Sequence, residues 1–270
     1  MTTLSLGLLL GLALRPCTAL GQAPAEAIPK HVTFTIDSRV VAEPRIIHVY
    51  TPPGYAESPD TRFPVVYMPD GGMDEDFPHV INTIDSLIAL HVIRPVLVVG
   101  IPNTERRRDL TGPTTVHEDS AIAKHVGGSA AFRGFIRGEL MPEVRKRYRC
   151  TDETTIVGES LAGLFIVETF LLEPALFQRY IALSPSLWWN NGELVRSAER
   201  RLDALGGLQR TLYLAAANEG GITSETAALA GLLQAHAPPG LVWTYAPRPD
   251  LEHSTIFRVV APGALARVLK

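Results

Sequence analysis

The sequence predicts a single domain of the α/β class, with a mostly parallel, doubly wound sheet and an antiparallel edge at the N-terminus. Short apolar runs rich in β-branched residues alternate with segments of helical spacing along most of the chain. The 270 residues are 46% hydrophobic, which is enough for one sizeable core. The 21 prolines are scattered between elements and form no linker, and no internal repeat is visible.

The first third of the chain supplies the antiparallel edge and the start of the parallel sheet. "HVTFTI" (31–36) and "RIIHVYTPP" (45–53) alternate like two antiparallel strands joined around Glu43-Pro44. "FPVVYMPD" (63–70) is a buried strand that ends in the turn Asp70-Gly71-Gly72. Residues 77–92 have helical spacing, and 95–102 form the next strand.

The remaining chain repeats the alternation of helix and strand. Residues 129–148 form an amphipathic helix for which we expect Ser129 to be the cap. We then expect strands at 153–158, 179–186, 210–218 and 241–248, and helices at 161–173, 192–205, 224–237 and from about Thr255. Ligands of open parallel sheets bind beyond the carboxyl ends of the strands. Four such ends carry chemically capable residues, namely Asp70-Gly71-Gly72, Ser160, Asn218-Glu219 and residues 250–254.

The N-terminal segment differs in kind from the rest. Residues 4–14 are apolar but too short to span a bilayer, and a small-residue stretch follows. We interpret residues 1–21 as a signal peptide and 22–270 as the functional domain, which implies a periplasmic or secreted protein without a membrane anchor. A misassigned start codon or a buried N-terminal helix is the alternative. Cys17 would leave with the signal, so that Cys150 has no partner for an internal disulfide. The formal charge of −3 and the lack of a basic run argue against a nucleic-acid partner.

A lone polar residue, Ser160, stands where a buried strand turns into a buried helix. The local sequence Gly158-Glu159-Ser160-Leu161-Ala162-Gly163 has small residues two before and two after the serine. Strand and helix backbones nearly touch in a nucleophile elbow, which is why the G-x-S-x-G pattern requires small residues there. Ala162 replaces the second glycine of the pattern, and we expect this change to be silent. The context predicts that Ser160 is a nucleophile.

A serine nucleophile needs a base and an acid that orients the base. Only His236 and His253 follow Ser160, and His236 is at a predicted helix end, whereas His253 lies in the loop before the last helix. We therefore predict His253 as the base. Glu219 follows a strand directly, and Gly220-Gly221 would let its loop bend back to the site. Glu219 is the first choice for the acid, and Asp250 and Glu252 are the competitors.

An oxyanion hole needs two backbone N–H groups directed at the developing negative charge. Leu161 follows the nucleophile at a helix N-terminus, where the helix dipole is favourable. The second donor is expected from the turn after strand 63–70, at Gly72.

At this point the sequence resembles the esterase branch of the α/β-hydrolases, which includes esterase D, feruloyl esterases, antigen-85 mycolyltransferases and enterochelin-type siderophore esterases. The resemblance rests on "VYTPPGY", "FPVVYMPDGG", "NTERRRDLTGPT", "GESLAGLF", "SPSLWWN" and the terminal "EHST". It implies the α/β-hydrolase fold, Ser160 as nucleophile and His253 as base. "SPSLWWN" and the spacing of Arg106, Asp109 and Thr111 look most like the siderophore-esterase subgroup, some members of which use only a Ser–His pair.

Three side chains are candidates for binding the substrate. Trp188 and Trp189 follow the strand after the nucleophile helix, where an aromatic face could stack on a catechol, phenol or sugar ring, although one of the two should belong to the core. Arg106 could attract an anionic substrate such as a ferric catecholate, or it could only pair with Asp109 to hold a loop.

The leading hypothesis is a serine carboxylic-ester hydrolase that acts through an acyl-enzyme on a small-molecule ester, without a metal or an organic cofactor. Aromatic or catecholate lactone esters are the expected substrates. An acyltransferase on the same scaffold and a siderophore-binding protein without catalysis are the alternatives. The oligomeric state cannot be predicted from these residues.

Overall fold

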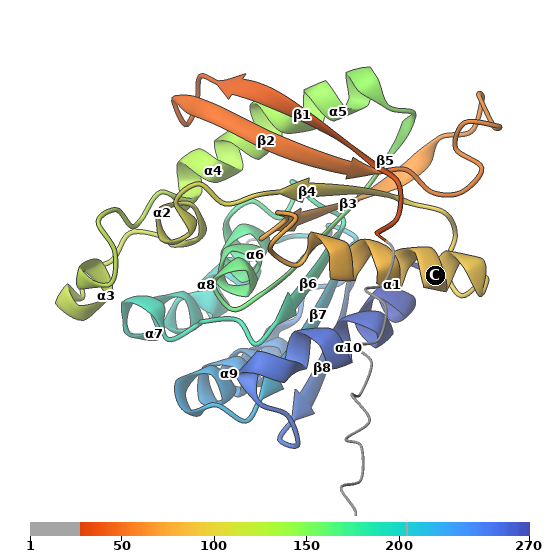
Figure 1. The fold of residues 1–270 in the computed structure, drawn as a ribbon. Helices are drawn as coiled ribbons and strands as arrows, with labels where there is room; N and C mark the ends of the chain where they lie inside the picture. The colour runs from red at the N-terminus through yellow and green to blue at the C-terminus, as the bar shows by residue number, and fades with distance from the viewer. Residues whose placement is uncertain (1–27, 204) are drawn as a thin grey trace, which may run out of the picture.

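A computed structural model describes residues 28–203 and 205–270 (Figure 1). The signal segment expected at 1–21 lies outside the described residues, and so does Cys17. The described chain forms one sheet with helices packed on both of its faces (Figure 1).

The sheet has eight strands in the order β1-β2-β4-β3-β5-β6-β7-β8. The first two strands form an antiparallel hairpin, and β2 also pairs antiparallel with β4. All the other pairs are parallel, which confirms the predicted mixed sheet with an antiparallel N-terminal edge. The strands are β1 (His31–Ser38), β2 (Glu43–Tyr50), β3 (Phe63–Pro69), β4 (Leu97–Ile101), β5 (Cys150–Glu159), β6 (Arg179–Leu183), β7 (Arg210–Ala217) and β8 (Leu241–Arg248).

Alternate residues of the buried strands face two separate cores. On one face of the sheet, Val66 and Met68 of β3 pack with α1 (Phe77–Ala89) and α10 (His253–Val268). On the other face, Val65 and Tyr67 pack with the remaining long helices. These are α4 (Ser129–Phe135), α5 (Met141–Arg147), α6 (Leu161–Leu172), α8 (Ala198–Asp203) and α9 (Gly220–His236). Helix α6, which follows Ser160, is buried along nearly its whole length, which explains its continuous apolar sequence.

Three details of the helices differ from the prediction. The helix expected at 129–148 contains a π-helical turn, η1 (Ile136–Leu140), between α4 and α5. The prediction that Ser129 caps this helix is wrong. Ser129 is already helical and buried, and Gly128 holds the cap position without a side-chain hydrogen bond. The helix expected at 192–205 is divided into α7 (Trp189–Arg196) and α8. Left-handed backbone at Asn190, Asn191 and Gly192 redirects the start of α7.

Two short helices were not predicted: α2 (Arg106–Leu110) and α3 (His117–Ala121). Each has five residues, which is too short for a hydrophobic period to be read from the sequence. Both lie in the connection between β4 and α4, where α2 is near the start of α4 and α3 lies farther out (Figure 1).

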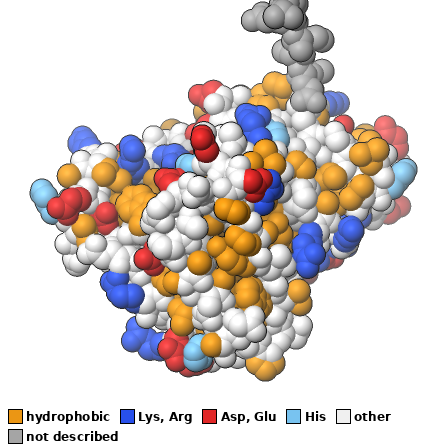
Figure 2. Space-filling model, turned by 90° about the horizontal axis from the view of Figure 1, so that it is seen from below, with side chains coloured by type: hydrophobic (Ala, Val, Ile, Leu, Met, Phe, Trp, Pro, Cys, Tyr) orange, Lys and Arg blue, Asp and Glu red, His pale blue; other side chains and the backbone are white. Residues whose placement is uncertain are grey.

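The surface combines charged groups with exposed apolar side chains. Seen from below, hydrophobic side chains gather in the middle of the face and charged side chains surround them (Figure 2). The edge strand β8 exposes 65% of Val242, and α10 exposes 50% of Val259. None of the helices built from residues 28–203 and 205–270 is long and apolar enough to cross a lipid bilayer.

Candidate active site

Ser160 occupies the sharp turn between β5 and α6, as the elbow pattern predicts. Its backbone is left-handed at φ 59° and ψ −120°, a conformation that costs free energy for a residue with a side chain. The Ser160 N–H donates to the Leu183 carbonyl of β6 at 3.0 Å, and the Ser160 carbonyl accepts from the Ser186 N–H at 3.0 Å. These neighbouring-strand contacts hold the turn, so that the side chain of Ser160 stays half-exposed at the carboxyl end of the sheet.

The small residues of the elbow are required by its packing. A Cβ atom on Gly158 would lie 2.7 Å from the Cβ of Ala162, closer than carbon atoms approach without displacement. A Cβ on Gly163 would lie 2.9 Å from the Cα of Pro185. Ala162 therefore fits because Gly158 faces it, which accounts for the departure from the usual pattern.

The Ser160 hydroxyl has a neighbour that the sequence did not single out. Its Oγ lies 3.4 Å from the Oγ of Ser186, which is buried after β6. No histidine is hydrogen-bonded to Ser160 within the described residues. In enzymes without substrate, the hydrogen bonds of the catalytic groups are commonly long or absent and tighten on binding. "SPSLWWN" carried the only sequence signal for Ser186.

The structure brings His253 and Glu219 together. Nδ1 of His253, the first residue of α10, lies 2.8 Å from Oε2 of Glu219, at the end of β7. The two groups make a close polar contact that lacks hydrogen-bond alignment, since Nδ1 makes no hydrogen bond with any described residue. Glu219 takes the N-cap position of α9, and Gly220 and Gly221 form the first turn of that helix. The loop that Gly220-Gly221 was expected to form is therefore wrong: both glycines are helical, and Glu219 meets His253 from the start of α9.

The two competing acids are engaged elsewhere. Asp250 accepts two hydrogen bonds from Arg248, at 2.8 and 2.6 Å. Glu252 caps α10 in a reciprocal capping box with Thr255. Among the three carboxylates considered from the sequence, Glu219 is the one within 4 Å of the His253 ring nitrogens.

The two expected oxyanion donors have different surroundings. Leu161 is the first residue of α6, where backbone N–H groups have no intrahelical acceptor. The Gly72 N–H, in contrast, donates to Oε2 of Glu75 at 2.7 Å. A carboxylate oxygen thus occupies this donor in the absence of substrate. Gly71 before it is required by close approach, because a Cβ there would lie 2.1 Å from the Ile101 nitrogen of β4.

Arg106 pairs with Asp70 and not with Asp109. Its Nε and Nη2 donate to the two carboxylate oxygens of Asp70 at 2.7 and 2.8 Å, so that the expected Arg106–Asp109 pair is wrong. Asn103 also donates to Asp70, at 2.5 Å, and to Glu75, at 2.6 Å. Arg106 and Asn103 therefore hold both ends of the turn that contains Gly72.

The two tryptophans have separate roles in the fold. Trp189 is buried, and its Nε1 donates to the Gly112 carbonyl at 2.9 Å. Trp188 is 37% exposed and lies against Gly221 in the first turn of α9, two residues from Glu219. The prediction that one member of the pair is core is confirmed, and Trp188 is the member open to a ligand.

A carboxyl group with an altered pKa lies next to Ser160 in the chain. Glu159, next to Ser160, is largely buried, and its Oε1 has no hydrogen-bond partner within the described chain. Burial raises the pKa of Glu159 to about 8, and the charges of Asp76 and Asp70 add to this effect. Burial likewise raises the pKa of Asp76, with Asp70 contributing. Across the described part of the chain, no three His, Cys, Asp or Glu side chains gather in a way that could hold a metal ion.

With this geometry in place, the comparisons with known proteins agree on one family. Residues 38–210, more than half of the 270-residue chain, match the family described as "Putative esterase". The chain belongs to this esterase family. The matched segment contains Gly72, Arg106, Ser160 and both tryptophans, whereas Glu219 and His253 lie beyond it.

Individual relatives are named as siderophore esterases. The chain is 29% identical to the ferri-bacillibactin esterase BesA of Bacillus subtilis over 199 residues, which cover 66% of each chain. It is 31% identical to a siderophore enterobactin esterase of Emericella nidulans over 39% of this chain and 40% of that protein. The matches thus span two thirds or less of these relatives.

A solved structure extends the similarity to most of the chain. An IroE-like serine hydrolase from Shewanella oneidensis is 28% identical, with a TM-score of 0.80, over 88% of this chain and 79% of that one. The predicted α/β-hydrolase fold is therefore confirmed.

Proposed function

We propose that this protein is a serine hydrolase of siderophore-type carboxylic esters. The arrangement that carries the proposal is the strained Ser160 elbow at the same sheet edge as the contact between His253 and Glu219. Membership of the esterase family and the siderophore esterases among its relatives support the class of reaction. The three side chains follow the order nucleophile, acid, histidine along the chain.

In the proposed reaction, Ser160 Oγ leaves its contact with Ser186 and attacks the ester carbonyl. Its proton passes to Nε2 of His253, and the imidazolium is stabilised by Glu219. The carbon–oxygen bond to the alcohol then breaks, and the alcohol leaves with the proton from His253. Water attacks the acyl-enzyme by the same route in reverse, which releases the carboxylic acid and restores Ser160.

The tetrahedral oxyanion would bind the N–H groups of Leu161 and Gly72. In the free protein, Oε2 of Glu75 occupies the Gly72 donor, so that substrate must displace this carboxylate oxygen. The contact supports the assignment because it shows that the Gly72 N–H is directed at a position where a negatively charged oxygen can lie.

The nucleophile is tested by Ser160→Ala. We expect turnover of p-nitrophenyl acetate to fall by ~10⁴-fold or more, with an unchanged thermal midpoint, because the base has nothing to activate. Fluorophosphonate should label the wild type and leave the variant unlabelled. Turnover of the variant near the wild-type rate, or labelling of the variant, would show that Ser160 is not the nucleophile.

The acid is tested by Glu219→Gln, with Asp250→Asn and Glu252→Gln as matched controls. We expect Glu219→Gln to reduce kcat by about two orders of magnitude. This loss is smaller than that of Ser160→Ala, since loss of the triad acid is the mildest of the three losses. The controls should keep wild-type kcat, because their carboxylates are bound to Arg248 and to the start of α10. A larger loss in either control than in Glu219→Gln would transfer the role of acid to that residue.

The substrate class is tested with a catecholate trilactone, a feruloyl ester and a long-chain p-nitrophenyl ester. We expect the aromatic substrates to be preferred, because the exposed face of Trp188 can stack on a ring. Trp188→Ala should lower kcat/KM for the aromatic esters about three- to ten-fold, whereas Trp243→Ala on the edge strand β8 should not. Fastest turnover of the long-chain ester, unchanged in Trp188→Ala, would overturn this assignment.

A further inference from the structure

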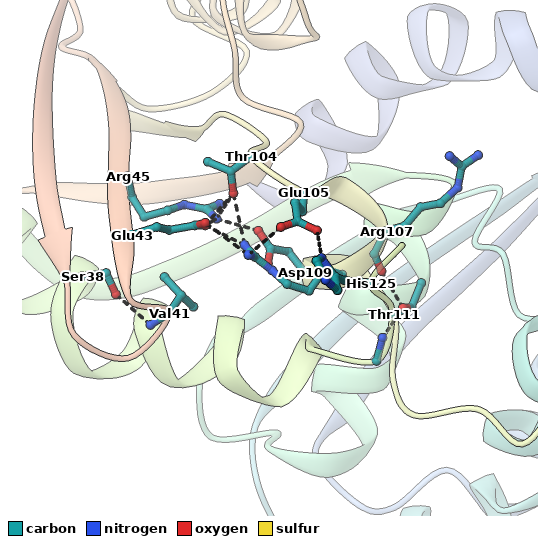
Figure 3. A network of polar contacts seen from close by, with 12 residues as sticks. Ser38, Val41, Glu43, Arg45, Thr104, Glu105, Arg107, Asp109, Thr111 and His125 are labelled. Atoms are coloured by element: carbon teal, nitrogen blue, oxygen red, sulfur yellow. Dashed lines mark hydrogen bonds and ion pairs between the residues drawn. The ribbon is translucent and has the colours of Figure 1, made fainter. Parts of the chain in front are cut away.

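A buried ion pair joins the N-terminal hairpin to the segment after β4. Nη1 of Arg45, on β2, lies 2.6 Å from Oδ2 of Asp109, on α2, and both residues are only 1% exposed. Glu43 contributes a second carboxylate 2.8 Å from Arg45, and Arg108 bridges Glu43 and Asp109 at 2.6 and 2.7 Å (Figure 3).

This network is expensive as a source of stability. Removing an arginine and a carboxylate from water costs about as much as their attraction returns. Nε of Arg45 is also buried without a hydrogen-bond partner among residues 28–203 and 205–270. The guanidinium also donates to Oγ1 of Thr104 at 2.7 Å and to the Pro102 carbonyl at 3.3 Å, and it lies 5.1 Å from the ring centre of Phe132. The Arg45–Asp109 pair therefore contributes little net stability, but it fixes the position of α2 relative to β2.

Helix α2 needs such an anchor because it cannot define its own position. Its five residues are far fewer than an isolated helix requires. No side chain caps its N-terminus. Its position is therefore set by tertiary contacts, which include the buried Asp109 pair with Arg45 and the packing of Leu110 in the core.

The segment that α2 belongs to contacts the candidate site at both ends. Arg106, three residues before Asp109, holds Asp70 through two hydrogen bonds. Asn103 holds Asp70 and Glu75, and Glu75 in turn accepts from the Gly72 N–H. At the other end, the carbonyl of Gly112 accepts from Trp189, the neighbour of the exposed Trp188.

We propose that the Arg45–Asp109 ion pair positions the oxyanion turn, and that Arg45 and Asp109 are positioning residues of the esterase reaction. The inference rests on the proposed function. A displacement of α2 would move Arg106 and Asn103, and with them the Asp70–Gly72 turn that holds the Gly72 N–H. A donor displaced by a fraction of an ångström stabilises the transition state less, while ground-state binding of the ester is hardly affected.

The test compares Asp109→Asn with Asp85→Asn. Asp85 accepts a hydrogen bond of 2.6 Å from Tyr50, the last residue of β2, at the opposite end of this strand from Arg45. Both variants remove one carboxylate charge from a contact to the same strand. Rates on p-nitrophenyl acetate are measured well below each thermal midpoint. We expect kcat of Asp109→Asn to fall on the order of 10- to 100-fold, and its KM to stay within about two-fold of the wild-type value. Asp85→Asn should lose stability and keep its kcat.

A second variant separates position from stability. In Arg45→Met/Asp109→Leu both charges are replaced by apolar groups, which should restore the thermal midpoint to at least the wild-type value. We expect its kcat to stay low, since the buried contact between α2 and β2 is then apolar and less directional, while the Arg106–Asp70 and Arg108–Glu43 pairs remain. If Asp109→Asn does not fold, the double variant is compared with Arg45→Lys, which keeps a positive charge beside Asp109. A kcat of Arg45→Lys between those of the double variant and the wild type supports the inference.

Two results would overturn the inference. One is a kcat of Asp109→Asn equal to that of Asp85→Asn, and the other is a return of kcat together with stability in the double variant. Failure of the proposed function is distinguishable from both, because wild type would then hydrolyse no ester or Ser160→Ala would remain active.

Discussion

At the scale of single residues, Glu159 is the group whose chemistry is most altered by its surroundings. It is next to Ser160 in the chain, has an unpaired buried oxygen, and interacts with the charges of Asp70 and Asp76. Burial, followed by these charges, raises its pKa from the ordinary 4.5 to about 8. The folded protein therefore holds a proton on Glu159 across the neutral range, which avoids another negative charge beside the developing oxyanion.

This shift predicts a pH-dependent stability with a definite sign. The folded state binds the Glu159 proton more tightly than the unfolded state, so the resulting stabilisation is complete below pH 4.5 and lost as the pH rises to about 8. Glu159→Gln stays neutral throughout. We expect the thermal midpoint of this variant, relative to wild type, to rise between pH 5 and 8 and then to level off.

The control for this prediction is Glu118→Gln, at an exposed position on α3. Melting curves of all three proteins at matched ionic strength measure the effect. A difference between Glu159→Gln and wild type that is the same at pH 5 and pH 9 would contradict the raised pKa.

The individual site residues show how far a sequence can define a site. The elbow, the histidine and the acid could be placed because each follows a strand in a fixed chain order. The partner of Arg106 could not, because Asp70 is 36 residues away and the pairing depends on where α2 lies. Glu75 on the Gly72 N–H was missed for a related reason: an acid three residues after a glycine has many possible conformations.

At the scale of elements, the contact between β5 and α6 determines whether the elbow can form. Gly158 on the strand faces Ala162 in the first turn of the helix, and a Cβ on Gly158 would approach the Ala162 Cβ to 2.7 Å. The contact has room for one methyl group. The motif therefore requires that only one of the two positions, 158 or 162, carries a Cβ atom.

This contact predicts a reciprocal mutational effect. Gly158→Ala should destabilise the protein and lower kcat, because strand and helix must separate around Ser160. Ala162→Gly should keep kcat and cost about 0.5–1 kcal/mol of stability, the usual penalty for glycine in a helix. In the double variant Gly158→Ala/Ala162→Gly the methyl group moves across the contact, and we expect most of the lost kcat to return.

Thermal melts and steady-state rates of the four proteins form a double-mutant cycle. Additive losses in the double variant would show that the two positions do not clash and that Ala162 is irrelevant to Gly158.

The long helices and the strands were largely predictable, because each has its own hydrophobic periodicity and is bounded by turn residues. The eight strands and the long helices α1, α6, α9 and α10 are confirmed within a few residues. The π turn at Ile136–Leu140 was not predictable, since it preserves the apolar spacing of an ordinary helix. The left-handed residues after Trp189, which redirect the start of α7, carry only an Asn-Asn-Gly signal.

At the scale of the whole molecule, two cores on opposite faces of one sheet must open together for the protein to unfold. Cys150 begins β5, near the middle of the sheet, and packs in the core that contains α4, α5 and α6. Its thiol is 7% exposed, and burial raises its pKa from 9.0 to about 11. Since the thiolate is the reactive form, the shift alone lowers the reactive fraction about 100-fold.

The position of Cys150 makes it a reporter of global unfolding. In a Cys17→Ser chain, Cys150 is the remaining cysteine of the sequence. We expect Ellman's reagent to leave the native protein unmodified over minutes and to react at once in denaturant. The denaturant midpoint from thiol labelling should coincide with the midpoint from far-ultraviolet circular dichroism, because the thiol is released only when the sheet and its cores come apart. Rapid labelling at a denaturant concentration where the dichroism is still native would contradict this, and would show that the start of β5 opens on its own while the Ser160 end of the strand stays folded.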